Sequence, residues 1–146
     1  MTGEIKRKVL IAVDGSESSQ RALEWAKTNM VSPTDRIIIV TVRASHQVPS
    51  IRRHDLEEHW KAIEADSLLA AQNLLAVSKA QFPDNEVDTY TLVGDARIEL
   101  EAKIAQVTPA LVIVGSRGMG SIKKLIVGSV SKYLLDHVQA PVLVVR

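Results

Sequence analysis

Short runs of consecutive apolar residues recur along the chain, and longer segments with a helical apolar period lie between them. Five runs predict β-strands because they are short, rich in β-branched residues and bounded by turn formers; they cover residues 8–13, 36–42, 87–93, 111–114 and 142–145. Most of these runs are continuously apolar, as expected for strands that are covered on both faces. The third run is more polar, so we expect it near an edge of the sheet.

The segments between these runs predict four helices. They extend from Ser16 or Ser18 to about residue 29, from about 55 to 82, from 96 to 106, and from 129 or 130 to 137. The first helix has an apolar stripe of Ala22, Leu23, Trp25 and Ala26. In the second helix a 3.6-residue period connects Leu56, Trp60, Ile63, Ala70, Leu74 and Val77. Both tryptophans are expected in the core or at an interface, and the polar residues 43–55 are expected to form a loop.

The alternation of strands and helices predicts an α/β fold with a parallel sheet. Right-handed crossovers between parallel strands place helices on both faces of such a sheet. No linker, internal repeat or shift in composition divides the sequence, so we expect one domain over residues 1–146.

Composition narrows the class of protein. Hydrophobic residues make up 46% of the chain but aromatic residues only 3%, so the core must be aliphatic. The net charge of +1 argues against bulk binding to nucleic acid or to an acidic membrane, so neither is expected as a partner. The sequence has no cysteine, which excludes disulfides, cysteine-ligated zinc and thiol catalysis. The apolar run at residues 9–13 is too short for a signal peptide or a membrane span, so a soluble, cytoplasmic protein is expected.

The densest group of glycines follows the fourth predicted strand. Four of the seven glycines lie between Gly115 and Gly128, and Gly128-Ser129 opens the last predicted helix. Glycine lets the backbone approach an anion closely, and the amides at a helix start point toward it. The stretch therefore predicts a phosphate-binding loop, in which Arg117 can add a forked donor. As alternatives, Gly128-Ser129 could form only a turn and a helix cap, and Arg117 could be a solvated surface cation.

Two other loops leave from the carboxyl ends of predicted strands, where ligands bind in open parallel sheets. Asp14 follows the first strand, and Val42 ends the second. If the first and fourth strands are neighbours, these loops converge with the glycine-rich stretch on one crevice. Asp14 also has a simpler possible role, as the cap of the first helix.

The sequence lacks the standard nucleotide and catalytic motifs. No Gly-Lys-Ser/Thr completes a Walker A motif, and Lys123 stands where a dinucleotide fingerprint needs its third glycine. There is no Gly-x-Ser-x-Gly nucleophile elbow. His54 and His59 would lie about 140° apart on a helix, which is a poor geometry for binding a metal.

The spacing Gly115-x2-Gly118-x9-Gly128-Ser129 resembles the nucleotide-binding signature of the universal stress protein family, in its ATP-binding branch. The resemblance covers the whole chain. Other family landmarks occur in the family's order at residues 12–16, 94–96 and 141–145.

This resemblance implies a three-layer, Rossmann-like sandwich, similar to the adenine nucleotide alpha hydrolases, with five parallel strands in the order 3-2-1-4-5. In the family pattern, Val13 and Asp14 lie beside the ribose and the adenine, and the main chain of Val42 meets the adenine. The glycine loop and the start of the last helix hold the phosphates. The predicted nucleotide site comprises Ala12, Val13, Asp14, Val42, Val114, Gly115, Arg117, Gly118, Gly128, Ser129, Val130 and Ser131. Lys123 and Lys124 are expected on a flap over the phosphates.

The expected function is that of a small ATP-binding regulatory module in the stress response, with Mg²⁺ or Mn²⁺ arriving on the phosphates. No residue is clearly placed as a hydrolytic base; Asp14 is the nearest candidate, so any ATP hydrolysis is expected to be slow. An alternative is a dimeric interaction protein in which nucleotide is structural or absent. The resemblance implies a homodimer formed through the apolar edge strand Val142–Val145. A third reading is an enzyme that uses an adenylate, for which the short loops leave little room for a second substrate.

Overall fold

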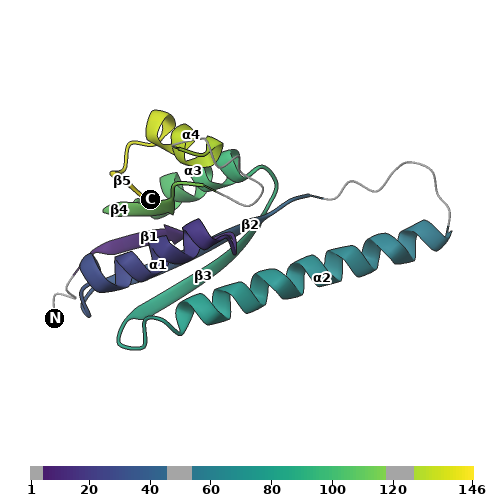
Figure 1. Ribbon diagram of the computed structural model, residues 1–146, viewed down its shortest axis with the longest axis horizontal. Coiled ribbons are helices and arrows are strands. Elements are labelled where there is room, and N and C mark those ends of the chain that lie inside the picture. Colours follow the sequence, from purple (N-terminus) through teal and green to yellow (C-terminus); the bar gives the residue numbers. More distant parts are fainter. Residues whose placement is uncertain (1–4, 46–53, 118–126) are drawn as a thin grey trace.

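The computed structural model describes residues 5–45, 54–117 and 127–146. Five strands form one parallel sheet in the order β3-β2-β1-β4-β5, as Figure 1 shows. The strands are β1 (Lys8–Ala12), β2 (Arg36–Arg43), β3 (Glu86–Val93), β4 (Leu111–Gly115) and β5 (Val142–Val145). The predicted sheet and strand order are confirmed, and the more polar third strand does lie at an edge.

The helices are α1 (Glu17–Asn29), α2 (His54–Lys79), α3 (Ala96–Val107) and α4 (Ser129–His137). Their bounds agree with the predicted segments to within one residue, apart from the end of α2, which lies three residues before the predicted one. Most of the predicted loop at 43–55 falls at residues 46–53, which lie outside the described part of the chain. None of the helices described by the structure is long and apolar enough to cross a membrane.

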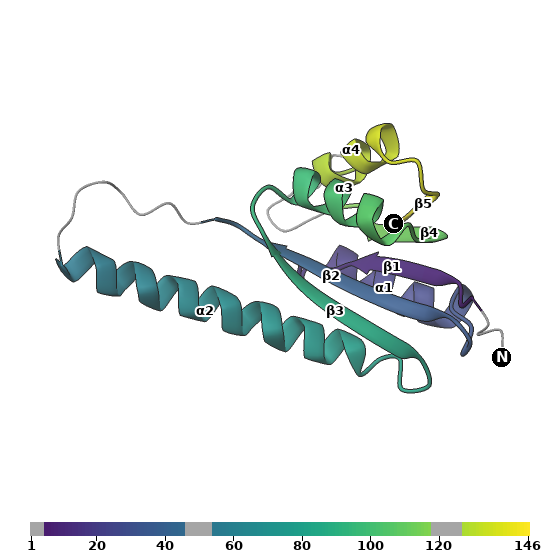
Figure 2. The same ribbon diagram turned by 180° about the vertical axis from the view of Figure 1, so that it is seen from behind.

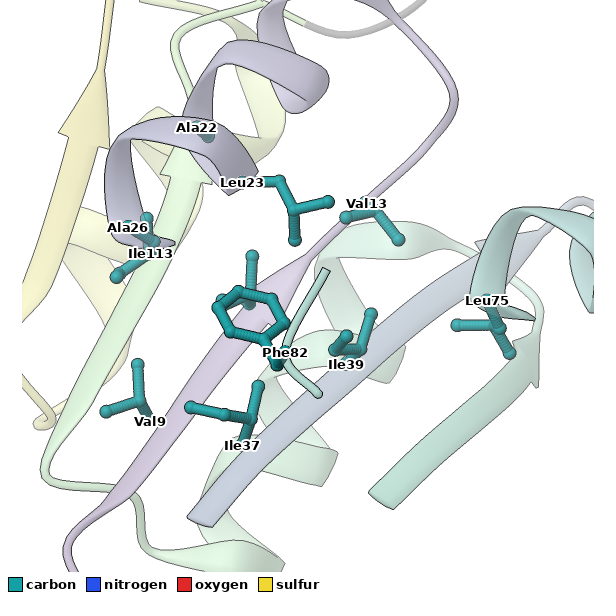
Figure 3. Close-up of a cluster of buried hydrophobic side chains, with 11 residues drawn as sticks. Val9, Val13, Ala22, Leu23, Ala26, Ile37, Ile39, Leu75, Phe82 and Ile113 are labelled. Atoms are coloured by element: carbon teal, nitrogen blue, oxygen red, sulfur yellow. The ribbon is translucent and has the colours of Figure 1, made fainter. Parts of the chain in front are cut away.

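Two aliphatic clusters fill the spaces between the sheet and its helices. Successive residues of a strand point to opposite faces, so Val9 and Ile11 pack with α1 and α2, whereas Leu10 packs with α3 and α4. Figure 3 shows the first of these clusters, in which Phe82 is the single aromatic side chain. The sheet therefore has helices on both faces (Figure 2). The loops that follow the strands lie at the carboxyl ends of the strands, which the helices do not cover.

The apolar stripe predicted on α2 is rotated away from the surface that is actually buried. Leu56 and Val77 are 38% and 59% exposed, whereas Ala71 and Leu75 are buried. Because alanine occurs on several sides of this helix, its apolar period does not determine which side meets the sheet. The first turns of α2 also extend beyond the strands that the helix covers, as Figures 1 and 2 show.

Of the two places expected for Trp25, the core and an interface, the structure excludes the core. Its side chain is 37% exposed, whereas Ala22 and Ala26 on the same helix are fully buried. The two small alanines let α1 lie close to the sheet, and this close packing leaves room for a large ring only on the flank of the helix. Trp60 on α2 is half-buried.

Candidate functional site

A pocket of about 90 Å³ lies at the carboxyl ends of β1, β2 and β4, where it meets the first turns of α3 and α4. Nine of the twelve predicted residues line it: Ala12, Val13, Asp14, Val42, Val114, Gly115, Arg117, Val130 and Ser131. The pocket thus joins segments that are more than 100 residues apart in sequence. Its walls are mainly aliphatic, and its polar lining residues are Asp14, Ser19, Arg117 and Ser131.

The other three predicted residues do not line this pocket. Gly128 is buried at the start of α4, and Ser129 is exposed beside it. Gly118 lies outside the described residues, as do Lys123 and Lys124 of the predicted flap.

The main chain of Val42 faces the space beyond the end of β1. Strand β1 ends at Ala12, and the next amide, that of Val13, donates to the carbonyl of Val40 across 2.9 Å. In a strand, the N–H and C=O of every second residue point to the same side. Those of Val42 therefore point toward β1, but the β1 strand has already ended there. One backbone donor and one acceptor are thus directed into the pocket from β2.

Asp14 is held in the turn between β1 and α1. Its Oδ1 accepts hydrogen bonds from the amide of Ser16 at 2.9 Å and from the hydroxyl of Ser16. The amide of Asp14 donates to Oγ of Ser19 at 3.2 Å. Ser16, rather than Asp14 or Ser18, caps α1, because its side chain accepts from the amide of Ser19. The carboxylate of Asp14 is therefore oriented at the pocket without serving as the helix cap.

At the end of β4, the backbone passes too close to α1 for any side chain at Gly115. A Cβ atom there would lie 2.6 Å from Oγ of Ser18 and 2.7 Å from its carbonyl carbon. Two carbon atoms in non-bonded contact are normally about 3.5–4.0 Å apart. Gly115 thus lets β4 reach the start of α1, and this approach brings the following Arg117 to the pocket wall.

Helix α4 begins without a side-chain cap. Its N-cap is Gly128, whereas α1 is capped by Ser16 and α3 by Asp95. The first amides of a helix have no partner within the helix, and they carry the positive end of its dipole. Because Gly128 has no side chain to accept from them, the first amides of α4 can bind an anion at the pocket.

Ser131, in the first turn of α4, is fixed to the sheet. Its hydroxyl donates to the carbonyl of Gly115 at 2.6 Å, and the amide of Gly128 donates to the carbonyl of Ser116. These two bonds attach the start of α4 to the end of β4. Since the hydroxyl proton of Ser131 is already donated, the group that remains for an anion is its main-chain amide.

Asp95, the cap of α3, stays ionised far into the acid range. Hydrogen bonds from the side chain and the amide of Arg97 lower the pKa of Asp95 to about 2. Its carboxylate holds the first turn of α3, which brings Ala96 and Leu100 to the pocket.

The sequence interpretation missed four lining residues: Ser19, Val40, Ala96 and Leu100. Ala96 and Leu100 belong to α3, and the loop before α3 leaves from the carboxyl end of β3. Ligands in open parallel sheets bind at such strand ends, so applying this rule to β3 as well would have included both residues. Ser19 and Val40 carried no such signal. Within the described ranges there is no group of three His, Cys, Asp or Glu residues that could hold a metal ion.

The whole chain resembles known proteins. The sequence model of the Universal stress protein family matches residues 6–146. Universal stress protein YxiE of Bacillus subtilis is 27% identical over 147 residues, which cover 95% of this chain and 98% of YxiE.

Solved structures show the same fold. The protein MJ0577 superimposes with a TM-score of 0.79 at 23% identity, over 95% of this chain and 94% of that one. A universal stress protein family protein from Arabidopsis thaliana, solved with AMP bound, gives a TM-score of 0.69 at 22% identity, over 95% and 90% of the two chains. The match to the family model extends over nearly all of the sequence, and the chain belongs to the universal stress protein family.

Proposed function

We propose that the pocket binds an adenine nucleotide, ATP in the first place, and that the protein acts as a small regulatory module in the stress response. The observation that carries this proposal is the uncapped start of α4, which meets the main chain of Val42 and the side chain of Arg117 at one pocket. One end of the pocket offers backbone hydrogen bonds between aliphatic walls, and the other offers positive charge. An adenine nucleotide has a flat polar-edged base at one end and anionic phosphates at the other.

The base would lie at the ends of β1 and β2. There Val42 presents one donor and one acceptor, and the side chains of Val13, Val40 and Leu100 supply apolar surface for a ring. Asp14 at the same end presents a carboxylate to which ribose hydroxyls can donate. The family member from Arabidopsis with AMP bound supports the choice of an adenine nucleotide.

The phosphates would lie at the start of α4. The amides of Ser129, Val130 and Ser131 and the guanidinium of Arg117 are the donors, and each charge-assisted bond contributes about 1.5–3 kcal/mol. Mg²⁺ or Mn²⁺ would bind through the phosphates and water, because Mg²⁺ usually keeps several of its waters. Asp14 is the only carboxylate lining the described pocket, so ATP hydrolysis is expected to be slow.

Isothermal titration calorimetry with ATP tests this proposal. Arg117→Ala is expected to weaken ATP binding by about tenfold or more, because it removes one charge-assisted contact. Lys79→Ala, at the exposed end of α2, changes the net charge equally and should leave the affinity unchanged. Binding that is as tight in Arg117→Ala as in Lys79→Ala would contradict the placement of the phosphates, and an absence of ATP binding by the wild type would contradict the function.

A second proposed property is a homodimer formed through β5. This strand is at the edge of the sheet, and its outer side has no neighbour among the described strands. The carbonyl of Pro141 accepts from Val112 of β4, and that of Val145 accepts from Ser116, directly after β4. The main chain of Val142 and Val144 therefore points outward. Edge strands with exposed main-chain groups pair readily with another strand.

Light scattering at micromolar concentration should therefore give the mass of two chains. Val144→Pro removes one outward N–H without removing a bond to β4, and it is expected to shift the protein toward the monomer. The corresponding control is Val77→Ala, which changes an exposed side chain on α2. A wild type that is monomeric at this concentration would contradict the dimer.

A further inference from the structure

Ser18 ties the first turn of α1 to the segment that follows β4. Its side chain is buried, with 4% exposure, and it does not line the pocket. Its Oγ accepts a hydrogen bond from the amide of Arg117 at 3.1 Å and lies 3.4 Å from Oγ of Ser116. A hydroxyl in the first turn of one helix is thus bonded to a loop 99 residues later in the chain.

The same loop is held from two other directions. Ser16 lies with its Oγ 3.4 Å from the carbonyl of Arg117, and Ser131 donates to the carbonyl of Gly115. The absence of a side chain at Gly115 lets Ser18 approach this closely. Residues 115–117 are therefore fixed between α1 and α4, and the main-chain direction at Arg117 depends directly on Ser18.

We propose that Ser18 is a positioning residue that sets the preference of the site for phosphorylated nucleotides over nucleosides. This inference rests on the nucleotide-binding function proposed above. Ser18 acts through Arg117: it accepts from the amide of Arg117 and so fixes the main chain of this residue at the pocket wall, which Arg117 shares with Val130 and Ser131 of α4. Without this acceptor, the Arg117 amide loses its hydrogen bond to α1, and the main chain that carries the Arg117 side chain is fixed less firmly at the pocket wall.

The base and ribose end of the pocket does not depend on this contact. Val42 is held by the β2–β3 pairing, and Asp14 is held by Ser16 and Ser19. Loss of the Ser18 hydroxyl should consequently weaken the binding of ligands that carry phosphates and spare adenosine. A general loss of structure would weaken the binding of both.

The test compares the affinities of ATP and adenosine by calorimetry in the wild type and in Ser18→Ala. Ser18→Ala is expected to lose about tenfold in ATP affinity, equivalent to about 1.4 kcal/mol, with adenosine affinity unchanged. Ser78→Ala is the matched control, because it also removes a buried hydroxyl, 2% exposed, but on α2. It should leave the ratio of the two affinities as in the wild type.

Two measurements keep the inference testable if Ser18→Ala folds poorly. Ser18→Cys keeps nearly the same side-chain volume but replaces the hydroxyl by a thiol, which is a weak acceptor, so a loss of ATP affinity in the same direction is expected. Amide hydrogen exchange at Arg117 in the nucleotide-free protein should be faster in either variant than in the wild type.

The outcomes separate this inference from the function on which it rests. If the wild type binds ATP but Ser18→Ala binds it equally well or more tightly, the positioning role is wrong and the proposed function stands. An equal loss of ATP and adenosine affinity would also overturn the positioning role, because it would show a structural effect alone. A wild type that binds no ATP overturns the proposed function itself.

Discussion

A side chain that caps α4 should make the protein slightly more stable and yet weaken its binding of nucleotide. Gly128 has φ −69° and ψ 165°, a conformation that every residue adopts, so Gly128→Ser and Gly128→Asp can place an oxygen on the first amides of α4. In the wild type those amides are proposed to hold the phosphates. The new oxygen and the ligand would then compete for the same donors.

The effect on stability is favourable and small, whereas the effect on ATP affinity is unfavourable and larger. Replacing glycine by serine or aspartate at an N-cap stabilises a helix by only a few tenths of a kcal/mol. Loss of one charge-assisted bond to a phosphate costs about 1.5–3 kcal/mol, which lowers the affinity for ATP by about 10- to 150-fold. Aspartate should have the larger effect, because its charge also repels the phosphates.

The assay is calorimetry with ATP and adenosine, together with urea unfolding of each variant. Gly128→Ala is the matched control. Because Gly128 is buried, an added Cβ atom alone can disturb its surroundings, and alanine adds this atom without an acceptor. Both capped variants should bind ATP more weakly than Gly128→Ala and adenosine equally well. Equal ATP affinity in all three variants would refute the assignment of the α4 amides to the phosphates.

Three further predictions concern stability. The pKa of Asp95 is lowered to about 2 from an ordinary value of 3.8. The contribution of its carboxylate to the free energy of unfolding is therefore complete above about pH 4 and is lost as the pH falls through about 2. Asp95→Asn should flatten this part of the curve of unfolding free energy against pH, measured by urea unfolding. Asp35→Ala should lower the free energy of unfolding by about 1–3 kcal/mol in urea titrations, because the buried carboxylate accepts two bonds from Arg7, at 2.6 and 3.0 Å. Leu134→Ala should lower it by about 2–5 kcal/mol, since Leu134 is the fully buried side chain that anchors α4; a loss below 1 kcal/mol would contradict this packing.

The strands were predictable because each signal lies within a few residues. The run Ile37–Val40 is apolar at every position, and the structure covers it on both faces. The helical period of apolar residues in α2 was equally visible in the sequence, but the side of the helix that faces the sheet was not. That rotation depends on which line of side chains fits the sheet, and a sequence with alanine on several sides of the helix leaves this choice to the packing.

Most of the candidate site was predictable for a different reason. Strand ends in a parallel sheet meet at one edge, so Asp14, Val42 and Gly115 could be brought together before any distance was known. The hydrogen bonds of Ser18 and Ser131 could not, because each joins a hydroxyl to the main chain of a segment 16 or more residues away. The sequence around a serine near a helix start does not indicate which main-chain group its hydroxyl will bond.

The most direct measurement is a titration of the isotope-labelled protein with ATP, followed by NMR of the backbone amides. The largest chemical shift changes are expected at the amides of Val42, Ser129, Val130 and Ser131, which belong to the two ends of the pocket. Adenosine should reproduce the change at Val42 and leave the three amides of α4 nearly unshifted. No saturable change with ATP, or changes confined to residues remote from the carboxyl ends of the strands, would contradict nucleotide binding at this pocket.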